Sequence, residues 1–440
     1  MPSGAIESAF GRLTGAKAGD PCVDISDAAC RAQPRSFITH AASLSATKTA
    51  DGLIDPKLVL AWLLTSLGAG PGLIGLLVPV REAGALLPQI FTAGFLHRLP
   101  RRKWAWAAGS AVQGLAALGM VVAALTLDGT RAGWAIVGLL AVLAVARSVC
   151  SVSYKDVLGK TVDRQRRGAA TGLASSVAAA FVIVFALILM SGAIERRGLV
   201  LAALALAGGL WIAAAALFAT LPEERDAASG DAPLRALREG LRVVMGDRQL
   251  GWFILTRGLL ISTALAPPFM VALGSDEDGG ALGRLGALVL ASSLAGLVSG
   301  YVWGRLADVS SRKVLALTAL AATISLGATV AADMGGLIGR SWVLPVLLFT
   351  LMIAYQGVRL GRSTHLVDMA TPETRATYTA VSNTAIGVLL LFGGLFGVMA
   401  EMYGPRAVLI ALAAMAALAV PAALRLEEVQ RADDGTEAEA

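Results

Sequence analysis

Long apolar stretches follow one another along almost the whole chain, with short polar connections between them. A helix needs about 20 apolar residues to cross the hydrocarbon core of a bilayer. The pattern therefore predicts an all-α membrane protein with twelve spanning helices. We expect these helices at 38–67, 71–96, 104–126, 133–157, 168–192, 198–221, 249–273, 282–304, 313–333, 342–366, 377–400 and 405–424.

The longest internal connection divides the predicted helices into two sets of six. Within it, Leu234, Leu237, Leu241 and Val244 recur at helical spacing with charged residues between them, which predicts an amphipathic helix on the membrane surface. The acidic end of the chain is expected to be disordered. The expected parts are an N-terminal cytoplasmic arm at 1–37, a six-helix bundle at 38–221, the linker at 222–248, a second bundle at 249–424 and the tail at 425–440.

Basic residues gather in alternate connections. The connections after the second, fourth and eighth predicted helices are rich in Lys and Arg, whereas those on the opposite side carry few. Because cytoplasmic loops of membrane proteins carry an excess of Lys and Arg, we expect both termini in the cytoplasm. The expected location is the inner (plasma) membrane of a bacterium.

Two of these basic connections carry matching motifs. Residues 94–103 read GFLHRLPRRK and residues 304–313 read GRLADVSSRK, each with Gly first, Leu two residues later and a basic pair at the end. Arg167 and Arg375 are separated by nearly the same number of residues as the two motifs, and each opens the next predicted helix. The two halves are therefore interpreted as a parallel repeat, an architecture that is known among transporters.

With these motifs the chain resembles the major facilitator superfamily, whose signature in both connections is G-x-L-A-D-x-x-G-R-[KR]. The second copy has Ser311 in place of the second Gly, and the first copy has Arg98 in the acidic position. The resemblance implies two six-helix bundles around a central cavity that opens alternately to either side, with no enzymatic activity. It implies a cytoplasmic gate of charge-assisted hydrogen bonds. The expected gate residues are Gly94, Arg102, Lys103, Gly304, Asp308, Arg312 and Lys313.

Charged residues also fall inside the predicted membrane segments, where a charge normally faces a cavity or a partner. Gly52 and Pro56 interrupt the first segment beside Asp51 and Asp55, which are four residues apart and would share one face of a helix. Either carboxylate is a candidate proton-coupling group, and a structural ion pair is the equal alternative. The resemblance to proton-coupled members suggests that Asp51 pairs with Arg147.

The expected solute cavity is therefore a charged one. Bases outnumber acids among these intramembrane residues, which favours an anionic solute, because Arg binds carboxylate or phosphate through two parallel hydrogen bonds. Lys155 and Arg362 are alternatively expected to reach the membrane interface. Three hypotheses stay open: proton-coupled transport of a small solute such as an organic anion, export of amphipathic compounds, and a non-transporting sensor or assembly factor. The expected cavity residues are Asp51, Asp55, Arg81, Glu82, Arg147, Arg257, Tyr355, Gln356 and Arg359.

Composition and the remaining motifs exclude other classes of protein. Charged residues make up 15% of the chain, against about 25% in a soluble domain. The net charge of +6 belongs to the basic loops, so nucleic acid is not an expected partner. The sequence has no phosphate-binding loop and no paired metal-ligand motif, so neither a cofactor nor a metal is expected. Cys22 and Cys30 are expected to stay reduced, and the chain is expected to act as a monomer whose partners are a solute, protons and the lipid bilayer.

Overall fold

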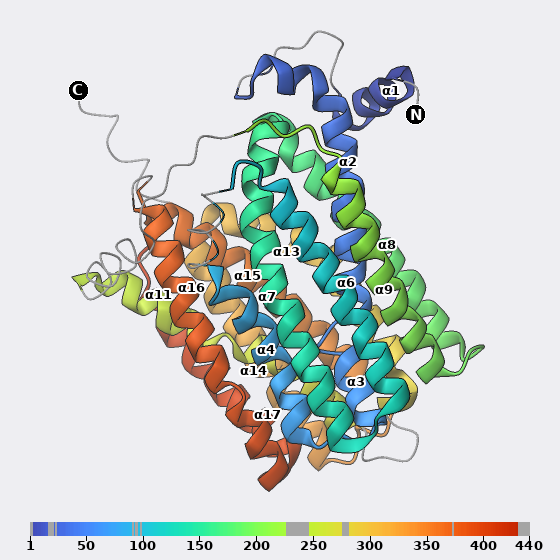
Figure 1. Cartoon of the computed structure of the whole chain (residues 1–440). Helices are drawn as coiled ribbons and strands as arrows, with labels where there is room; N and C mark the ends of the chain where they lie inside the picture. The colour runs from blue at the N-terminus through green and yellow to red at the C-terminus, as the bar shows by residue number, and fades with distance from the viewer. Residues whose placement is uncertain are drawn as a thin grey trace, which may run out of the picture.

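The structure, a computed structural model, describes residues 3–15, 22, 24–89, 92, 96, 99–225, 246–274, 281–371 and 374–429, and its regular elements there are all helices. Figure 1 shows most of them running side by side along one direction. The described chain begins with α1 (Ser3–Thr14) and ends after α17 (Leu395–Leu424) at the same end of the molecule, the upper end in Figure 1. We call this the N/C end and the opposite one the far end.

Each half of the chain contributes one group of spanning helices. Those of the first half are α2 (Asp27–Leu53), α3 (Val59–Ser66), α4 (Pro71–Leu86), α6 (Lys103–Thr126), α7 (Gly129–Thr161), α8 (Arg164–Ser191) and α9 (Arg196–Ala219). Those of the second half are α11 (Arg248–Leu259), α12 (Ser262–Leu273), α13 (Ala281–Val309), α14 (Ser311–Met334), α15 (Val343–Met369), α16 (Arg375–Phe392) and α17.

Helices lie at all twelve expected segments, although not every one is a continuous apolar rod. Nine stretches of the described residues are long and apolar enough to cross a membrane, and one of these, Thr377–Leu424, contains two of the expected segments. The first two segments fall short because α3 and α4 are short and α2 carries many polar residues. α2 also begins at Asp27, before the expected start at residue 38.

Two spanning segments are broken near their middles. The first is interrupted between α2 and α3, with Pro56 in the break, as Gly52 and Pro56 predicted. The seventh is interrupted between α11 and α12, just N-terminal to Pro267 and Pro268. Two prolines in sequence remove two amide donors from the helix, which weakens the preceding turn. Broken helices of this kind expose backbone groups where a cavity can use them.

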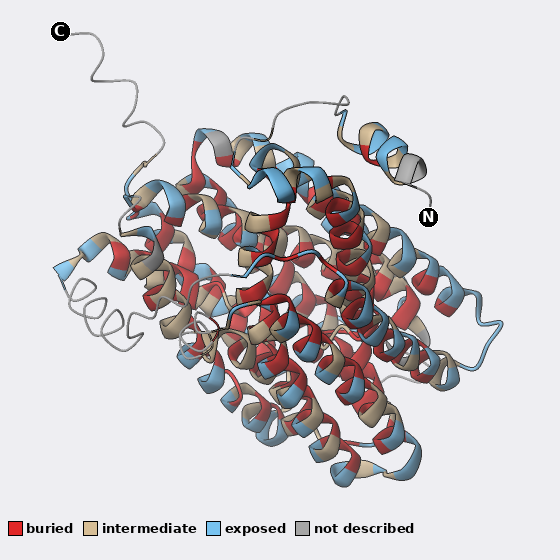
Figure 2. Ribbon diagram, turned by 45° about the horizontal axis from the view of Figure 1, so that its top comes forward, coloured by how far each residue is buried: buried red, intermediate tan, exposed pale blue. Residues whose placement is uncertain are grey.

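The outer surface of the bundle is apolar. Figure 2 shows buried positions on the sides of the helices that face their neighbours and exposed positions on the outward sides. Many of the exposed side chains are large hydrophobic ones, including Leu115 on α6, Phe181 on α8 and Ile324 on α14. A soluble monomer rarely exposes such extensive apolar surface, whereas a bilayer solvates it.

The packing of the helices repeats between the two halves. α6 packs on α7 and α9 in the first half, and α14 packs on α15 and α17 in the second. Between the halves, α4 contacts α16 and α17, and α8 contacts α13. The halves therefore meet where α4 packs on α16 and α17 and where α8 packs on α13, and α12 adds contacts to α3 and α4.

The backbones of the two halves come into close contact near the far end. A Cβ added to Gly75 of α4 would lie 2.4 Å from the Cα of Gly397 in α17, so only glycine permits this approach. A Cβ added to Gly286 of α13 would lie 2.7 Å from the backbone nitrogen of Met190 in α8. Backbone contact of this kind closes the far end of the interface.

An acid at the end of each half holds the start of a helix at the N/C end. The carboxylate of Glu223, which follows α9, accepts the backbone N–H groups of Arg102 and Lys103 at 2.9 and 2.8 Å, at the start of α6. Glu428, which follows α17, accepts from Ser310 Oγ at 2.7 Å, at the start of α14. Both acids lie at the positive end of a helix dipole. The repeat thus extends to two residues that the sequence analysis did not single out.

Replacing Glu223 with Ala should lower the free energy of unfolding by about 2 kcal/mol, because two amide donors in the protein interior lose a charged acceptor. Reversible unfolding of the purified protein in mixed detergent measures this. Glu224→Ala is the matched control, since Glu224 is the next acid along the chain, is exposed, and accepts from the exposed hydroxyl of Ser26 rather than from buried amides. Equal stability of the two variants would contradict the capping role of Glu223.

The arm before α2 departs from expectation. Cys22 and Cys30 are joined by a disulfide, so the expectation that both stay reduced is wrong for this structure. Their Cα atoms lie 6.0 Å apart, within the range that a disulfide spans. The loop between them holds Asp24, whose carboxylate accepts from the backbone N–H of Arg164 at 3.0 Å and pairs with Arg167 at 2.6 Å. The residue spacing alone did not reveal this folded-back geometry.

Candidate functional site

Three charged side chains from three helices meet inside the first half. Asp51 lies near the end of α2, and its two carboxylate oxygens accept separately from Arg81 of α4, at 2.8 Å, and from Arg147 of α7. Arg81 and Asp51 are largely buried. Because one carboxylate bridges two guanidinium groups, this cluster links three helices and keeps one excess positive charge.

Asp55 lies away from Asp51, although the spacing of four suggested a shared helix face. The helix ends at Leu53, so Asp55 falls in the break, where its Oδ1 accepts the backbone N–H of Lys57 at 2.7 Å. The buried Lys57 ammonium lies 3.7 Å from the ring centroid of Tyr355 on α15. This cation–π contact joins the break in the first half to the second half.

A polar cavity of about 420 Å³ lies between the halves, bordered by α2, α8, α13 and α15. Its charged lining residues are Lys48, Asp55 and Arg359. Lys48 Nζ donates to Ser175 Oγ at 2.6 Å, and Arg359 donates to Gln356 Oε1 at 3.4 Å. The cavity thus combines two cations and one carboxylate with hydroxyl and amide groups, and such a lining can bind a polar solute.

A smaller chamber of about 70 Å³ adjoins this cavity, because Arg359 lines both. Its polar walls are Glu82 of α4, Arg257 of α11, Thr263 of α12, and Tyr355, Arg359 and Arg362 of α15. Arg257 is buried, and its guanidinium donates to Ser382 Oγ at 2.7 Å and to Asn383 Oδ1 at 2.9 Å. Arg257 is therefore held in place by neutral acceptors.

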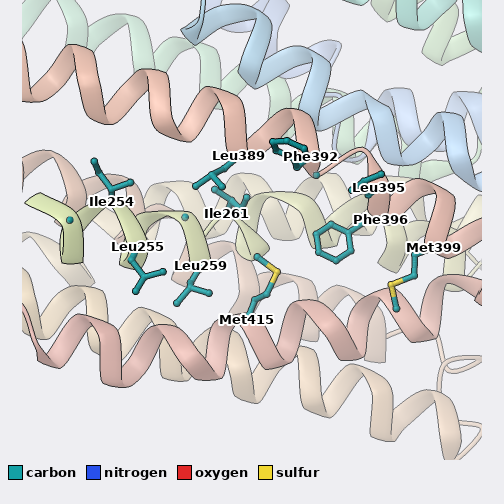
Figure 3. Close-up of a pocket in the computed structure, with 13 residues that line it drawn as sticks. Ile254, Leu255, Leu259, Ile261, Leu389, Phe392, Leu395, Phe396, Met399 and Met415 are labelled. Atoms are coloured by element: carbon teal, nitrogen blue, oxygen red, sulfur yellow. The ribbon is translucent and has the colours of Figure 1, made fainter. Parts of the chain in front are cut away.

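A third cavity, of about 740 Å³, is apolar and lies apart from these charges. Figure 3 shows its lining of Leu, Ile, Phe and Met side chains from α11, α16 and α17, and Ile261 from the break before α12. Several of them, including Leu255, Phe392 and Leu395, are exposed on the outer surface. Such a wall suits acyl chains of the bilayer and has no polar group to orient a solute.

The comparisons with known proteins agree with this architecture. A family model described as the Major Facilitator Superfamily matches residues 257–440. The chain superposes on a variant of the nucleoside transporter NupG with a TM-score of 0.67 and 13% identity, over 89% of this chain and 100% of that one. A D-xylose-proton symporter superposes with a TM-score of 0.63 and 13% identity, over 90% of this chain and 98% of that one. A POT family transporter in complex with a thioalcohol-conjugated peptide superposes with a TM-score of 0.65 and 12% identity, over 89% of this chain and 95% of that one.

The second half of the chain matches the Major Facilitator Superfamily model, and the whole chain shares the fold of these solved transporters. The family match and the shared fold confirm the resemblance and the all-helical fold class expected from the sequence. Nine stretches of the described residues are long and apolar enough to cross a membrane, so the chain is a multi-pass membrane protein. A search of curated proteins finds no match to the chain.

The expected gate motif of the first half lies at the N/C end and is held by acids from elsewhere in the chain. Arg102 forms an ion pair with Asp156 of α7. Lys103 Nζ donates to the backbone carbonyl of Leu221 at 2.6 Å. Gly94 lies outside the described residues, as do the predicted linker helix and most of the acidic tail. The motif in this half therefore joins α6, α7 and the segment after α9.

The second copy of the motif is held by the segment after α17. Arg312 pairs with Glu428 at 3.4 Å and donates to the backbone carbonyl of Leu426 at 3.3 Å. Gly304 lies in α13 with open space beside it, and Lys313 lies in the first turn of α14. Asp308 is part of α13, and its side chain lies outside the described positions.

Sequence reasoning missed the hydroxyl groups of the polar cavity. Two adjacent pairs, Ser175 with Ser176 on α8 and Ser292 with Ser293 on α13, line it from opposite halves. The available signal was a serine pair inside an otherwise apolar segment, repeated on a second helix. A serine also fits a helix interface by its small size, so the sequence by itself did not separate the two roles.

Proposed function

We propose that this chain moves a small organic anion across the membrane by alternating access, with proton coupling, as a monomer. The observation that carries the proposal is the polar cavity between the halves, with Lys48 and Arg359 in its lining. Arg359 also borders the chamber that contains Arg257 and Arg362. Such an excess of cations favours an anion in the cavity.

Proton coupling rests on the carboxylates near this cavity. Asp51, Asp55 and Glu82 all lie on the first-half side, next to bases from both halves. A carboxylate that exchanges a basic partner for a proton can link proton entry to a change of contacts between halves. One of the similar solved structures is described as a proton symporter, which supports the same coupling here.

We assign the N/C end to the cytoplasm of a bacterial inner membrane. The basic connections that follow the second, fourth and eighth spanning segments all belong to this end, in agreement with the positive-inside rule. Under this assignment the close backbone contacts of Gly75 and Gly286 lie on the outer side of the membrane.

Uptake into proteoliposomes tests the function. Wild-type protein should acidify the vesicle interior when organic anions are added outside. Arg359→Gln should lower anion uptake about tenfold or more, because one charge-assisted hydrogen bond contributes about 1.5–3 kcal/mol. Arg131→Gln, an exposed residue at the far end of the bundle, is the matched control.

The outcomes separate the competing functions. Unchanged anion uptake in Arg359→Gln and Arg147→Gln would contradict an anionic solute and favour an exporter of amphipathic compounds. Proton flux that persists in both Asp51→Asn and Asp55→Asn would remove these two acids from the coupling role. Wild-type protein without any solute-linked flux would instead favour a sensor or assembly factor.

A further inference from the structure

The basic residues in the polar cavity, in the smaller chamber and beside them differ in how they are neutralised. Arg81 and Arg147 share the carboxylate of Asp51 in the described ion pairs. Arg257 has neutral acceptors, and Arg359 donates to the neutral Gln356. The acid that lines the chamber with Arg257, Arg359 and Arg362 is Glu82.

Glu82 comes from the opposite half of the protein to these three arginines. It follows Arg81 on α4, and successive helical residues point about 100° apart, so Arg81 reaches Asp51 while Glu82 lines the chamber. Lys57, Arg81, Arg359 and Arg362 all lie close enough for their charges to act on its carboxylate. Glu82 is thus a carboxylate of the first half inside a cationic chamber built mainly by the second half.

Arg257 gives a second, independent indication of an anion site. Its side chain is buried, and its Nε has no hydrogen-bond partner among the described residues. A buried guanidinium with an unsatisfied donor is costly unless an anion compensates it for part of the transport cycle. The chamber of about 70 Å³ has room for one small group beside it.

We infer that Glu82 is an internal counter-ion that the solute's anionic group replaces. This inference rests on the proposed transport function and deepens it. In the empty protein the carboxylate of Glu82 offsets one of the positive charges of the chamber. When a carboxylate or phosphate of the solute accepts hydrogen bonds from Arg257, Arg359 and Arg362, Glu82 takes up one proton from the water of the cavity and becomes neutral. One anion and one proton enter together, so the charge of the chamber does not change.

The adjoining cavity indicates the rest of the solute. Ser175, Ser176, Ser292, Ser293 and Gln356 offer hydroxyl and amide groups next to Arg359. These groups pair with hydroxyls of a ligand better than with apolar atoms. The solute class is therefore a hydroxylated organic anion, with its charged group in the small chamber and its hydroxyl groups in the larger cavity.

The charged and titratable groups around Glu82 make this exchange favourable. They come from α4, α7, α11 and α15 and from the break after α2, whereas α12 and α16 line the chamber with uncharged side chains. They are Arg81 on α4, Asp55 and Lys57 in the break, Arg147 on α7, Arg257 on α11, and Tyr355, Arg359 and Arg362 on α15. Because cations dominate this set, the chamber retains one anionic charge, from either Glu82 or the solute.

Titration calorimetry of the purified full chain tests the inference. The probes are gluconate, a hydroxylated carboxylate, and glycerol 3-phosphate, a hydroxylated phosphate. Titrations in buffers with different ionisation enthalpies count the protons taken up. For wild-type protein we expect one proton per bound anion above neutral pH, with binding that weakens about tenfold for each added pH unit. The probe that binds more tightly shows whether the chamber prefers a carboxylate or a phosphate.

Glu82→Gln should abolish this proton uptake. Its anion affinity should become independent of pH and about tenfold tighter than that of the wild type at pH 8, because the competing carboxylate is gone. Glu82→Asp keeps the acid and should keep proton uptake, so it serves if the Gln variant does not fold. Glu7→Gln, an exposed acid on α1, is the matched control.

Two results would overturn the inference. Proton uptake that is unchanged in Glu82→Gln would show that another group takes the proton. Failure of both probes to bind the wild-type protein would exclude a hydroxylated-anion site. Neither result would by itself remove the transport function, which the proteoliposome assay measures separately with other solutes.

Discussion

Replacing Asp51 with Asn lowers the free energy of unfolding by about 3 kcal/mol, because two arginines lose the charge that they share. Asn keeps the size of the side chain, so the loss reports the charge rather than a cavity. We expect transport to fail as well, since Asp51 links α2, α4 and α7 beside the solute cavity. Unfolding in mixed detergent and uptake into proteoliposomes measure the two effects.

The arginines around Asp51 provide the internal control. Arg147→Gln should be milder than Asp51→Asn, because Asp51 then still pairs with Arg81 and because Arg147 is 37% exposed. The double variant Asp51→Asn with Arg147→Gln should recover part of the lost stability, since only one arginine is left without its acid. Equal stability of Asp51→Asn and the wild type would contradict a structural role for this cluster.

Replacing Gly75 with Val opens the far end of the protein. A side chain at this position would overlap the backbone of Gly397, at 2.4 Å from its Cα. Overpacking of this kind costs about 1–3 kcal/mol in the closed state. The balance between the two access states should therefore shift about 5–150-fold toward opening at the far end.

Cysteine labelling measures this shift. Ser292→Cys places a reporter in the cavity, and a membrane-impermeant maleimide added on the far side reaches it only when that side opens. Labelling should be slow in the otherwise wild-type protein and at least several-fold faster with Gly75→Val. Gly138→Val, at a glycine with open space around it, should label like the wild type. If the protein with Gly75→Val is labelled as slowly as the otherwise wild-type protein, this contact does not close the far end.

Hydropathy and loop motifs were sufficient to predict most of the fold. Apolar length identifies spanning helices because every backbone polar group in a bilayer must be satisfied within the helix. The repeat was found because basic residues at the ends of helices make matching contacts in both halves. Arg167 and Arg375 illustrate this, since each donates to the backbone carbonyl eight residues earlier, of Gly159 and Val367.

The site was only partly predictable because side-chain partners come from distant segments. Asp51 and Asp55 have a helical spacing, but α2 ends at Leu53, between them. Asp51 therefore pairs with Arg81 and Arg147, whereas Asp55 lies in the break. Glu223 and Glu428 follow their last helices without any local signal of the helix starts that they hold. No periodicity in one segment encodes such a contact.

The sequence by itself determined the number of helices, the duplication and the presence of costly charges inside the membrane. These properties are local, because each depends on the composition of one segment or on the similarity of two. The tertiary structure decided which charges neutralise one another and which stay available to a solute. Packing brings α4 against the second half and turns Glu82 toward Arg359 and Arg362, whereas Arg81, one residue earlier, is directed to Asp51.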